Sequence, residues 1–190
     1  MAKRIVLDQG HEPKIDNGAC YKDLQEAVLT RLIGNYVVSL SATQPLFQVK
    51  RVPSVGGIRL ISPNLNRKIK WINQNSKTTD LLISIHINAG GGTGIESWGY
   101  AGLPKSCMPF YKAIHNEVVK ATGLKDRGIK DEKNNKHGQL GIIHNTRPIA
   151  ILVECGFIDK DYVWLKDEKN LYKVAQGIIN GINQYLKINK

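Results

Sequence analysis

The sequence predicts an α/β fold: a single-domain three-layer sandwich with a mostly parallel mixed sheet and helices on both of its faces. Short apolar runs of strand length alternate along the chain with longer segments whose apolar residues recur at helical spacing. The alternation is not interrupted by an internal repeat or by a linker rich in Pro and Ser. A chain of 190 residues has the length of one ordinary domain, so we expect residues 1–190 to form a single domain.

The first half of the chain begins with a predicted strand. Residues 4–7 form an apolar run that ends in Asp8-Gln9-Gly10-His11, which is typical of a buried strand opening into a loop. From Asp23 to about Leu40 the apolar spacing predicts a helix, with Asp23 near its start, where a carboxylate suits the positive end of the helix dipole. The other elements expected in this half are a strand at 47–52, a loop at 53–63 and a helix at 65–76.

The second half contains the two most apolar predicted strands. Residues 80–86 are nearly all apolar until the last, which is typical of a strand covered on both faces, and residues 149–154 repeat the pattern. The segment 125–138 is charged and rich in turn residues, so we expect an exposed loop there. We also expect a glycine-rich loop at 90–94, a strand at 95–100, helices at 104–122 and 170–187, and solvent-facing side chains at His115 and His137.

Composition describes a folded globular protein with a large surplus of positive charge. The chain is 42% hydrophobic and 23% charged, and 27 Lys and Arg against 16 Asp and Glu give a formal net charge of +11. Such a surplus favours a polyanionic partner: nucleic acid, an anionic membrane face or an acidic wall polymer. The basic residues are scattered and aromatic residues make up only 7%, so we expect no nucleic-acid partner and favour the wall polymer.

Targeting signals and cysteines narrow the setting further. No apolar run approaches the roughly 20 residues that span a bilayer, so we expect no membrane insertion. The first residues lack the apolar region of a secretory signal, which predicts synthesis in the cytoplasm without a signal peptide. The three cysteines are odd in number and contain no C-x-x-C pair, so a disulfide scaffold is excluded, and a reduced compartment or indifference to redox is expected. We separately expect the protein to be a monomer.

Three apolar runs end in residues that can bind a metal or transfer a proton. His11 follows the first run, His86 ends the second and Glu154 ends the third. In open α/β sheets, sites form beyond the carboxyl ends of the strands, so we expect these three side chains to converge. Two histidines and one carboxylate are a usual ligand set for a catalytic zinc ion, which keeps its fourth position for water.

Glu154 is the most informative of these positions. A carboxylate among apolar strand residues costs on the order of several kcal/mol unless it is paired or bound to a metal. Glu154 is therefore either the third metal ligand or the catalytic base, and the second role requires another carboxylate for the metal. Glu26 in the first predicted helix can reach the His11 loop, and Asp23 is a competing acid nearby. We expect Asp8 to support the His11 loop from behind.

Six segments of the chain match a known family pattern in the same order. From Arg4 to about Leu186 the chain resembles the zinc-dependent N-acetylmuramoyl-L-alanine amidases of the amidase-3 type, which are cell-wall hydrolases. The matching segments are Val6-Leu-Asp-Gln-Gly-His11, Glu26-Ala-Val-Leu-Thr-Arg-Leu-Ile-Gly34, Leu65-Asn-Arg-Lys-Ile-Lys-Trp-Ile-Asn73, Asp80-Leu-Leu-Ile-Ser-Ile-His-Ile-Asn-Ala89, Gly94-Ile-Glu-Ser97 and Val153-Glu-Cys-Gly-Phe157.

The resemblance implies a site and a reaction. It implies that His11, Glu26 and His86 hold one Zn²⁺ and that Glu154 is the catalytic carboxylate, which cleaves the amide between N-acetylmuramic acid and L-alanine of peptidoglycan. It implies a protein that acts on the bacterial cell wall after release, as a phage lysin does. Candidate substrate contacts are Glu96, Arg67 and His144, the last at the entry to the Glu154 strand.

Two other functions remain open from the sequence. The first is a zinc peptidase that cuts a different bond of the stem peptide. The second is a wall-binding module without catalytic activity, which the four polar positions argue against.

Overall fold

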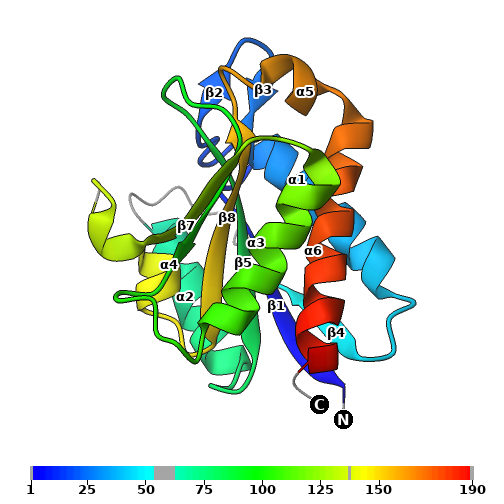
Figure 1. The fold of residues 1–190 in the computed structure, drawn as a ribbon. Coiled ribbons are helices and arrows are strands. Elements are labelled where there is room, and N and C mark those ends of the chain that lie inside the picture. Colours follow the sequence, from blue (N-terminus) through cyan, green and yellow to red (C-terminus); the bar gives the residue numbers. More distant parts are fainter. Residues whose placement is uncertain (1, 54–62, 137, 189–190) are drawn as a thin grey trace.

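The computed structural model describes residues 2–53, 63–136 and 138–188, and it has the predicted three-layer α/β architecture (Figure 1). Four strands of its sheet run parallel, while β6 pairs antiparallel with β8 and parallel with β7. The strand order is β4 (Phe47–Arg51), β1 (Lys3–Gln9), β5 (Leu81–Asn88), β8 (Ile149–Phe157), β6 (Ile95–Gly99) and β7 (Asp126–Asp131).

Helices cover the two faces of the sheet unequally. The larger layer contains α1 (Glu26–Ser41), α3 (Met108–Thr122) and α6 (Glu168–Ile188), and the smaller contains α2 (Pro63–Asn75) and α4 (Gly141–His144) (Figure 1). Alternation along β1 divides the core accordingly, because Ile5 and Leu7 pack in the larger apolar cluster and Val6 packs in the smaller one. The thinner layer leaves room for a site on its face of the sheet.

Polar residues gather at one edge of the sheet, where β1, β5 and β8 end and β6 begins. His86 of β5 pairs with Glu154 of β8, and Glu154 pairs with Glu96 of β6. Asp8 of β1 pairs with Ser84 of β5 in the same way. By alternation these side chains all point to the α2 and α4 face, so four adjacent strands place their polar groups side by side.

Several short elements were not predicted from the sequence, among them a hairpin before α1 and a helix after β8. A hairpin of β2 (Cys20–Tyr21) and β3 (Leu24–Gln25) precedes α1, and α5 (Tyr162–Lys166) follows β8. Together they lie at the end of the sheet opposite the chain termini (Figure 1). The hairpin moves the start of the first helix from the predicted Asp23 to Glu26. Asp23 does not face a helix terminus but lies 2.8 Å from Lys166 Nζ through its Oδ2 atom.

The prediction of an exposed loop at 125–138 is wrong for the first half of that segment. Residues Asp126–Asp131 form strand β7 and Glu132–Asn134 a 3₁₀ turn. The strand could not be recognised from the sequence because its residues are mostly charged and include Gly128. Gly128 has a φ of 80° and lies at the point where the register between β7 and β6 shifts. His115 is also not solvent-facing: it is 2% exposed and bonded to Ser97 and Asp126.

Two further expectations concern the predicted loop with His137 and the absence of a membrane-spanning segment. Most of the predicted loop at 53–63, and His137, lie outside the described residues. Among the helices of the described chain, none combines the length and apolar character that a membrane crossing requires.

Candidate active site

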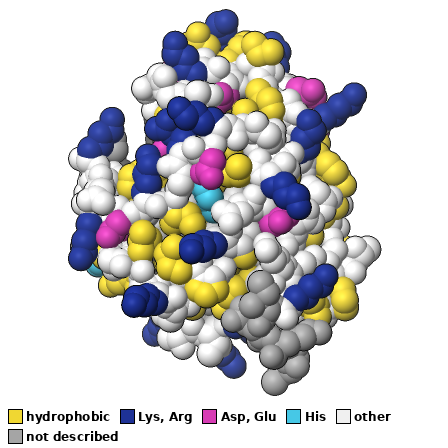
Figure 2. All heavy atoms as spheres, viewed as in Figure 1, with side chains coloured by type: hydrophobic (Ala, Val, Ile, Leu, Met, Phe, Trp, Pro, Cys, Tyr) yellow, Lys and Arg dark blue, Asp and Glu magenta, His cyan; other side chains and the backbone are white. Residues whose placement is uncertain are grey.

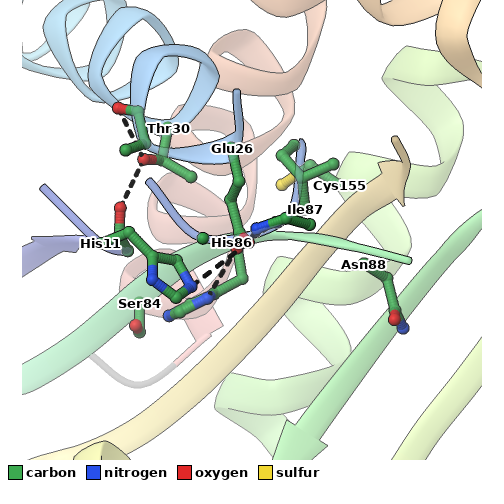
Figure 3. A network of polar contacts seen from close by, with 12 residues as sticks. His11, Glu26, Thr30, Ser84, His86, Ile87, Asn88 and Cys155 are labelled. Atoms are coloured by element: carbon green, nitrogen blue, oxygen red, sulfur yellow. Dashed lines mark hydrogen bonds and ion pairs between the residues drawn. The ribbon is translucent and has the colours of Figure 1, made fainter. Parts of the chain in front are cut away.

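Three side chains converge at the carboxyl edge of the sheet. Glu26 Oε1 lies 2.9 Å from His86 Nδ1, and Glu26 Oε2 lies 3.2 Å from His11 Nε2. One ligand atom of each residue lies within 4.8 Å of those of the other two. Figure 3 shows both imidazoles directed at the Glu26 carboxylate. The sequence-predicted trio is therefore brought together, from the end of β1, the first turn of α1 and the end of β5.

Backbone amides fix the Glu26 carboxylate from two sides. The amide of Ala19 donates to Oε2 at 2.9 Å and the amide of Ile87 donates to Oε1 at 3.0 Å. Burial alone would raise the pKa of Glu26, but the hydrogen bonds and charges of His11 and His86 outweigh it and hold that pKa far below its ordinary value. Glu26 is thus an ionised carboxylate at a fixed position.

The loop that carries His11 is held in an uncommon backbone conformation. His11 has a φ of 59°, which L-residues adopt rarely. Asp16 Oδ2 lies 2.8 Å from His11 Nδ1, and the Thr30 hydroxyl donates to the carbonyl of Gly10 at 2.7 Å. A carboxylate behind one ring nitrogen orients the other nitrogen toward the site, as is usual for metal-binding histidines.

A buried ion pair supports the same loop from the α2 side. Lys68 Nζ lies 2.9 Å from Asp8 Oδ1 and donates to the carbonyl of Gln9 at 2.6 Å. The Ser84 hydroxyl donates to Asp8 Oδ2 at 2.7 Å, which extends the network to the strand that carries His86. Burial would raise the pKa of Asp8, but the Lys68 charge and these bonds outweigh it and lower that pKa.

The donor set fits a divalent metal ion such as zinc. Two imidazole nitrogens and one carboxylate are ligands that zinc prefers, and they already face one point. Burial would lower the pKa of His11, but Glu26 and Asp16 outweigh it and raise that pKa to about 9. A strong negative field therefore exists where a cation would sit.

Glu154 lies next to the trio and differs from Glu26 in its surroundings. Burial, opposed by the nearby His86 and assisted by the charges of Glu26 and Glu96, raises the pKa of Glu154 to about 7. Its Oε2 atom is shielded from solvent and has no hydrogen-bond partner among the described residues. A carboxyl group that titrates near neutrality suits proton transfer in both directions.

Glu96, the candidate substrate contact on β6, is already engaged within the protein. Arg127 Nε and Lys130 Nζ each lie 2.7 Å from Glu96 Oε2, and Asn88 donates to Oε1 at 2.9 Å. Burial would raise the pKa of Glu96, but Lys130 and Arg127 outweigh it and lower that pKa.

The other two candidate contacts, His144 and Arg67, are not among the donors that converge at the trio. His144 stacks on Tyr100 with ring centroids 5.2 Å apart, and its Nδ1 lies 2.8 Å from the buried Glu132. Arg67 is half-buried on α2, and within the described chain its neighbour Lys68 is the one that contacts the His11 loop. Substrate binding by Glu96, His144 and Arg67 stays a prediction.

A pocket opens beside the trio on the α2 and α4 face. Its volume is about 220 Å³. It is lined by the imidazoles and Lys68 on one side and by apolar side chains on the other, among them Leu65, Leu140 and Ile142. The two imidazoles of the trio are therefore accessible to a small ligand.

Sequence reasoning missed the residues that support the site. Asp16 and Lys68 lie in a loop and a helix whose local pattern is that of ordinary solvated residues. The sequence signal for Lys68 is its position next to Arg67 in the predicted helix. Consecutive helix residues point about 100° apart, so a helix that does not direct Arg67 at the site can direct Lys68 there.

The mixed α/β sheet brings two histidines and two carboxylates together at the carboxyl ends of its strands, an arrangement suited to a hydrolase. A family model described as N-acetylmuramoyl-L-alanine amidase (Amidase_3) matches residues 5–184. The chain belongs to this family, and its activity is that of a peptidoglycan amidase.

Individual relatives agree with the family assignment. The chain is 30% identical over 189 residues to the N-acetylmuramoyl-L-alanine amidase CwlM of Bacillus licheniformis, covering 98% of this chain and 70% of that protein. It is 31% identical over 195 residues to the endolysin of Bacillus phage SPP1, covering 100% and 68%. The catalytic domain of CwlV from Bacillus (Paenibacillus) polymyxa var. colistinus superposes with a TM-score of 0.80 at 29% identity, covering 98% and 99%.

Proposed function

We propose that the protein cleaves the amide between N-acetylmuramic acid and L-alanine with one zinc ion held by His11, Glu26 and His86, and with Glu154 as the proton-transfer group. The observation that carries the proposal is the convergence of these three donors within 4.8 Å of one another, with Glu154 on the adjoining strand. Zinc bound there would supply Lewis acidity, which lowers the pKa of water and polarises a carbonyl.

Glu154 performs the proton transfers in this proposal. Its carboxylate accepts a proton from the water that attacks the lactyl carbonyl, and the resulting acid donates that proton to the nitrogen of L-alanine as the amide breaks. The pKa of about 7 places both forms of Glu154 within reach at neutral pH. The unpartnered Oε2 atom supports this role, because no structural hydrogen bond has to be broken for it to act.

The surrounding residues hold the ligands in place. Asp16 orients the His11 ring, and the amides of Ala19 and Ile87 orient the Glu26 carboxylate. These contacts are made by the protein itself, so the three donors are preorganised for the ion.

The reaction is tested on purified wall fragments by mass spectrometry. The proposal predicts release of intact stem peptides that begin with alanine, and a Glu154→Gln variant that retains metal but loses about 10²- to 10⁴-fold in kcat. Products cut within the stem would favour a peptidase instead, and binding without any turnover would favour a wall-binding module.

The setting in which the enzyme acts is also a proposal. One relative is the endolysin of Bacillus phage SPP1, and we propose that this chain likewise acts on the cell wall after release from the cell that makes it. The net charge of +11 supports attraction to anionic wall polymers.

A further inference from the structure

Glu96 of β6 and the basic residues Arg127 and Lys130 of β7 form a charged cluster beside Glu154. The proton transfers proposed above give this cluster no role. We propose that Arg127, assisted by Lys130, binds a carboxylate of the stem peptide that leaves with L-alanine. The inference rests on the role of Glu154 proposed above, and it adds a binding site for the peptide portion of the substrate.

The cluster holds more positive than negative charge. Arg127 and Lys130 both bind the same oxygen of Glu96, each at 2.7 Å. Glu96 is 3% exposed and its other oxygen accepts from the neutral amide of Asn88. Two cations thus share one carboxylate, which leaves one positive charge without a counter-charge inside the cluster.

Arg127 presents that charge in a form suited to a carboxylate. Its side chain is 28% exposed, and its guanidinium carbon lies 4.7 Å from the centroid of the Phe157 ring. Among the described residues only its Nε atom is engaged, by Glu96, so the two terminal nitrogens keep their donors. A guanidinium held by a ring and by one hydrogen bond offers a fixed pair of donors that matches a carboxylate.

Lys130 contacts the same oxygen of Glu96 as Arg127 does. Its side chain is 33% exposed and its Nζ lies 5.2 Å from the centroid of the Trp98 ring. It supplies a second, less directional cation next to the guanidinium.

The strand register places this cluster on the side of the leaving group. His86 pairs with Glu154, and Glu154 pairs with Glu96, so the order across the sheet is metal ligands, Glu154, then Glu96 with Arg127. The acid that protonates the leaving nitrogen must lie on the side of that nitrogen. The stem peptide continues from there toward β7.

The distances suit an early carboxylate of the stem. Adjacent strands lie about 4.8 Å apart, so Arg127 is about 10 Å from Glu154 across two strand spacings. An extended peptide covers about 3.3 Å per residue, so the second or third stem residue reaches the guanidinium. Stem peptides of peptidoglycan carry carboxylates at these positions.

The test compares two soluble substrates with the zinc-loaded enzyme. One is N-acetylmuramoyl-L-alanyl-γ-D-glutamyl-L-lysine, and the other is the same compound with its peptide carboxylates amidated. We expect wild-type kcat/KM to fall about tenfold on amidation, mainly through KM, because a charge-assisted hydrogen bond is lost. In Arg127→Gln, we expect the free-acid substrate to lose about tenfold and the preference between the two substrates to shrink to about threefold or less.

Matched variants separate binding from general effects. Lys125→Gln removes an exposed lysine two residues from Arg127 and is expected to keep the wild-type preference. Lys130→Gln is expected to reduce the preference as well, and it provides the test if Arg127→Gln does not fold.

Two results would overturn the inference while leaving the proposed function intact: equal KM for both substrates in the wild type, or an undiminished preference in Arg127→Gln. If the wild type releases no stem peptide from either substrate, the proposed function fails and the inference fails with it.

Discussion

Glu154 lies in a buried strand of the core, and its carboxyl group is also the titrating group at the site. Burial raises its pKa from an ordinary 4.5 to about 7. Between these two values the unfolded chain has released the proton while the folded protein still binds it, so raising the pH favours unfolding. The same burial that suits Glu154 for proton transfer therefore lowers the free energy of unfolding at neutral pH.

This conflict leads to the first prediction, for the metal-free protein. Its stability should fall as pH rises from about 4.5 to about 7, by at most about 3 kcal/mol from Glu154 alone. Glu154→Gln removes this contribution, so the variant should be the more stable protein at pH 8 and should lose its advantage near pH 4.5. Urea unfolding of both proteins across this range measures it. Parallel pH profiles for the two proteins would contradict the assignment.

A second prediction concerns the buried ion pair behind the His11 loop. Lys68→Met leaves the Asp8 carboxylate buried without its cation, which should cost about 3 to 5 kcal/mol of stability. The double variant Asp8→Asn/Lys68→Met should recover most of this loss, because neither charge then remains unpaired. Lys70→Met, on an exposed lysine of the same helix, is the control in chemical denaturation. A single variant as stable as the control would show that the pair contributes little.

The sequence predicted the site residues that end the apolar strands, and it missed the charged residues that support them. His11, His86 and Glu154 stand out because each interrupts or ends an apolar run, and burial of a polar group requires a reason. Lys68 and Asp16 lie in segments where a charged residue is ordinary. Their partners are distant in sequence, so no local pattern could indicate them.

The β2–β3 hairpin is the element that positions the first helix and its ligand. Gly18 precedes it with a φ of 64°, and a Cβ atom there would lie 2.5 Å from Glu26 Oε2 and 2.6 Å from His11 Cδ2. Only a residue without a side chain lets the backbone pass this close to two of the three donors.

A third prediction follows for this hairpin. Gly18→Ala should push Glu26 and His11 apart and weaken zinc binding by about tenfold or more. Gly123→Ala is the matched control, because Gly123 has a similar φ of 67° but open space around its Cα. Competition with a chromophoric chelator measures both affinities. Equal affinities in the two variants would contradict the prediction, because only Gly18 lies against the ligands.

Elements were predictable where their periodicity was strong. The buried strands at β1, β5 and β8 and the long helix α6 follow from apolar patterns that tertiary contacts reinforce. Strand β7 is polar because it lies at the sheet edge and uses Arg127 and Lys130 for Glu96. Such a strand has a loop-like composition, and only its pairing with β6 reveals it.

Over the whole molecule, positive charge is distributed and not gathered. Figure 2 shows Lys and Arg side chains across all of the face in view, with fewer acidic groups between them. A distributed charge of +11 acts at long range on any anionic surface and selects no single orientation.

The fourth prediction tests what this charge does. Raising the salt concentration from about 0.05 to 0.3 M should weaken lysis of intact cells far more than cleavage of a soluble muropeptide, because salt screens attraction to the wall polymer. Turbidity loss and product release, measured in the same buffers, compare the two. Equal salt sensitivity in both assays would show that the net positive charge does not act through attraction to the cell wall.

The fold class and the convergence of His11, His86 and Glu154 were predictable, because alternating elements indicate an α/β sheet and parallel strands end on one side of it. The short elements at the rim were not, since β2, β3 and α5 are too brief to carry periodicity.

Metal analysis of the purified protein beside a Glu26→Ala variant addresses the mechanism most directly. We predict one zinc ion per folded chain of the wild type, activity that disappears with a chelator and returns with one equivalent of zinc, and neither bound zinc nor activity in a folded Glu26→Ala protein. Full turnover by metal-free enzyme, or an alanine variant that keeps its zinc, would contradict the account.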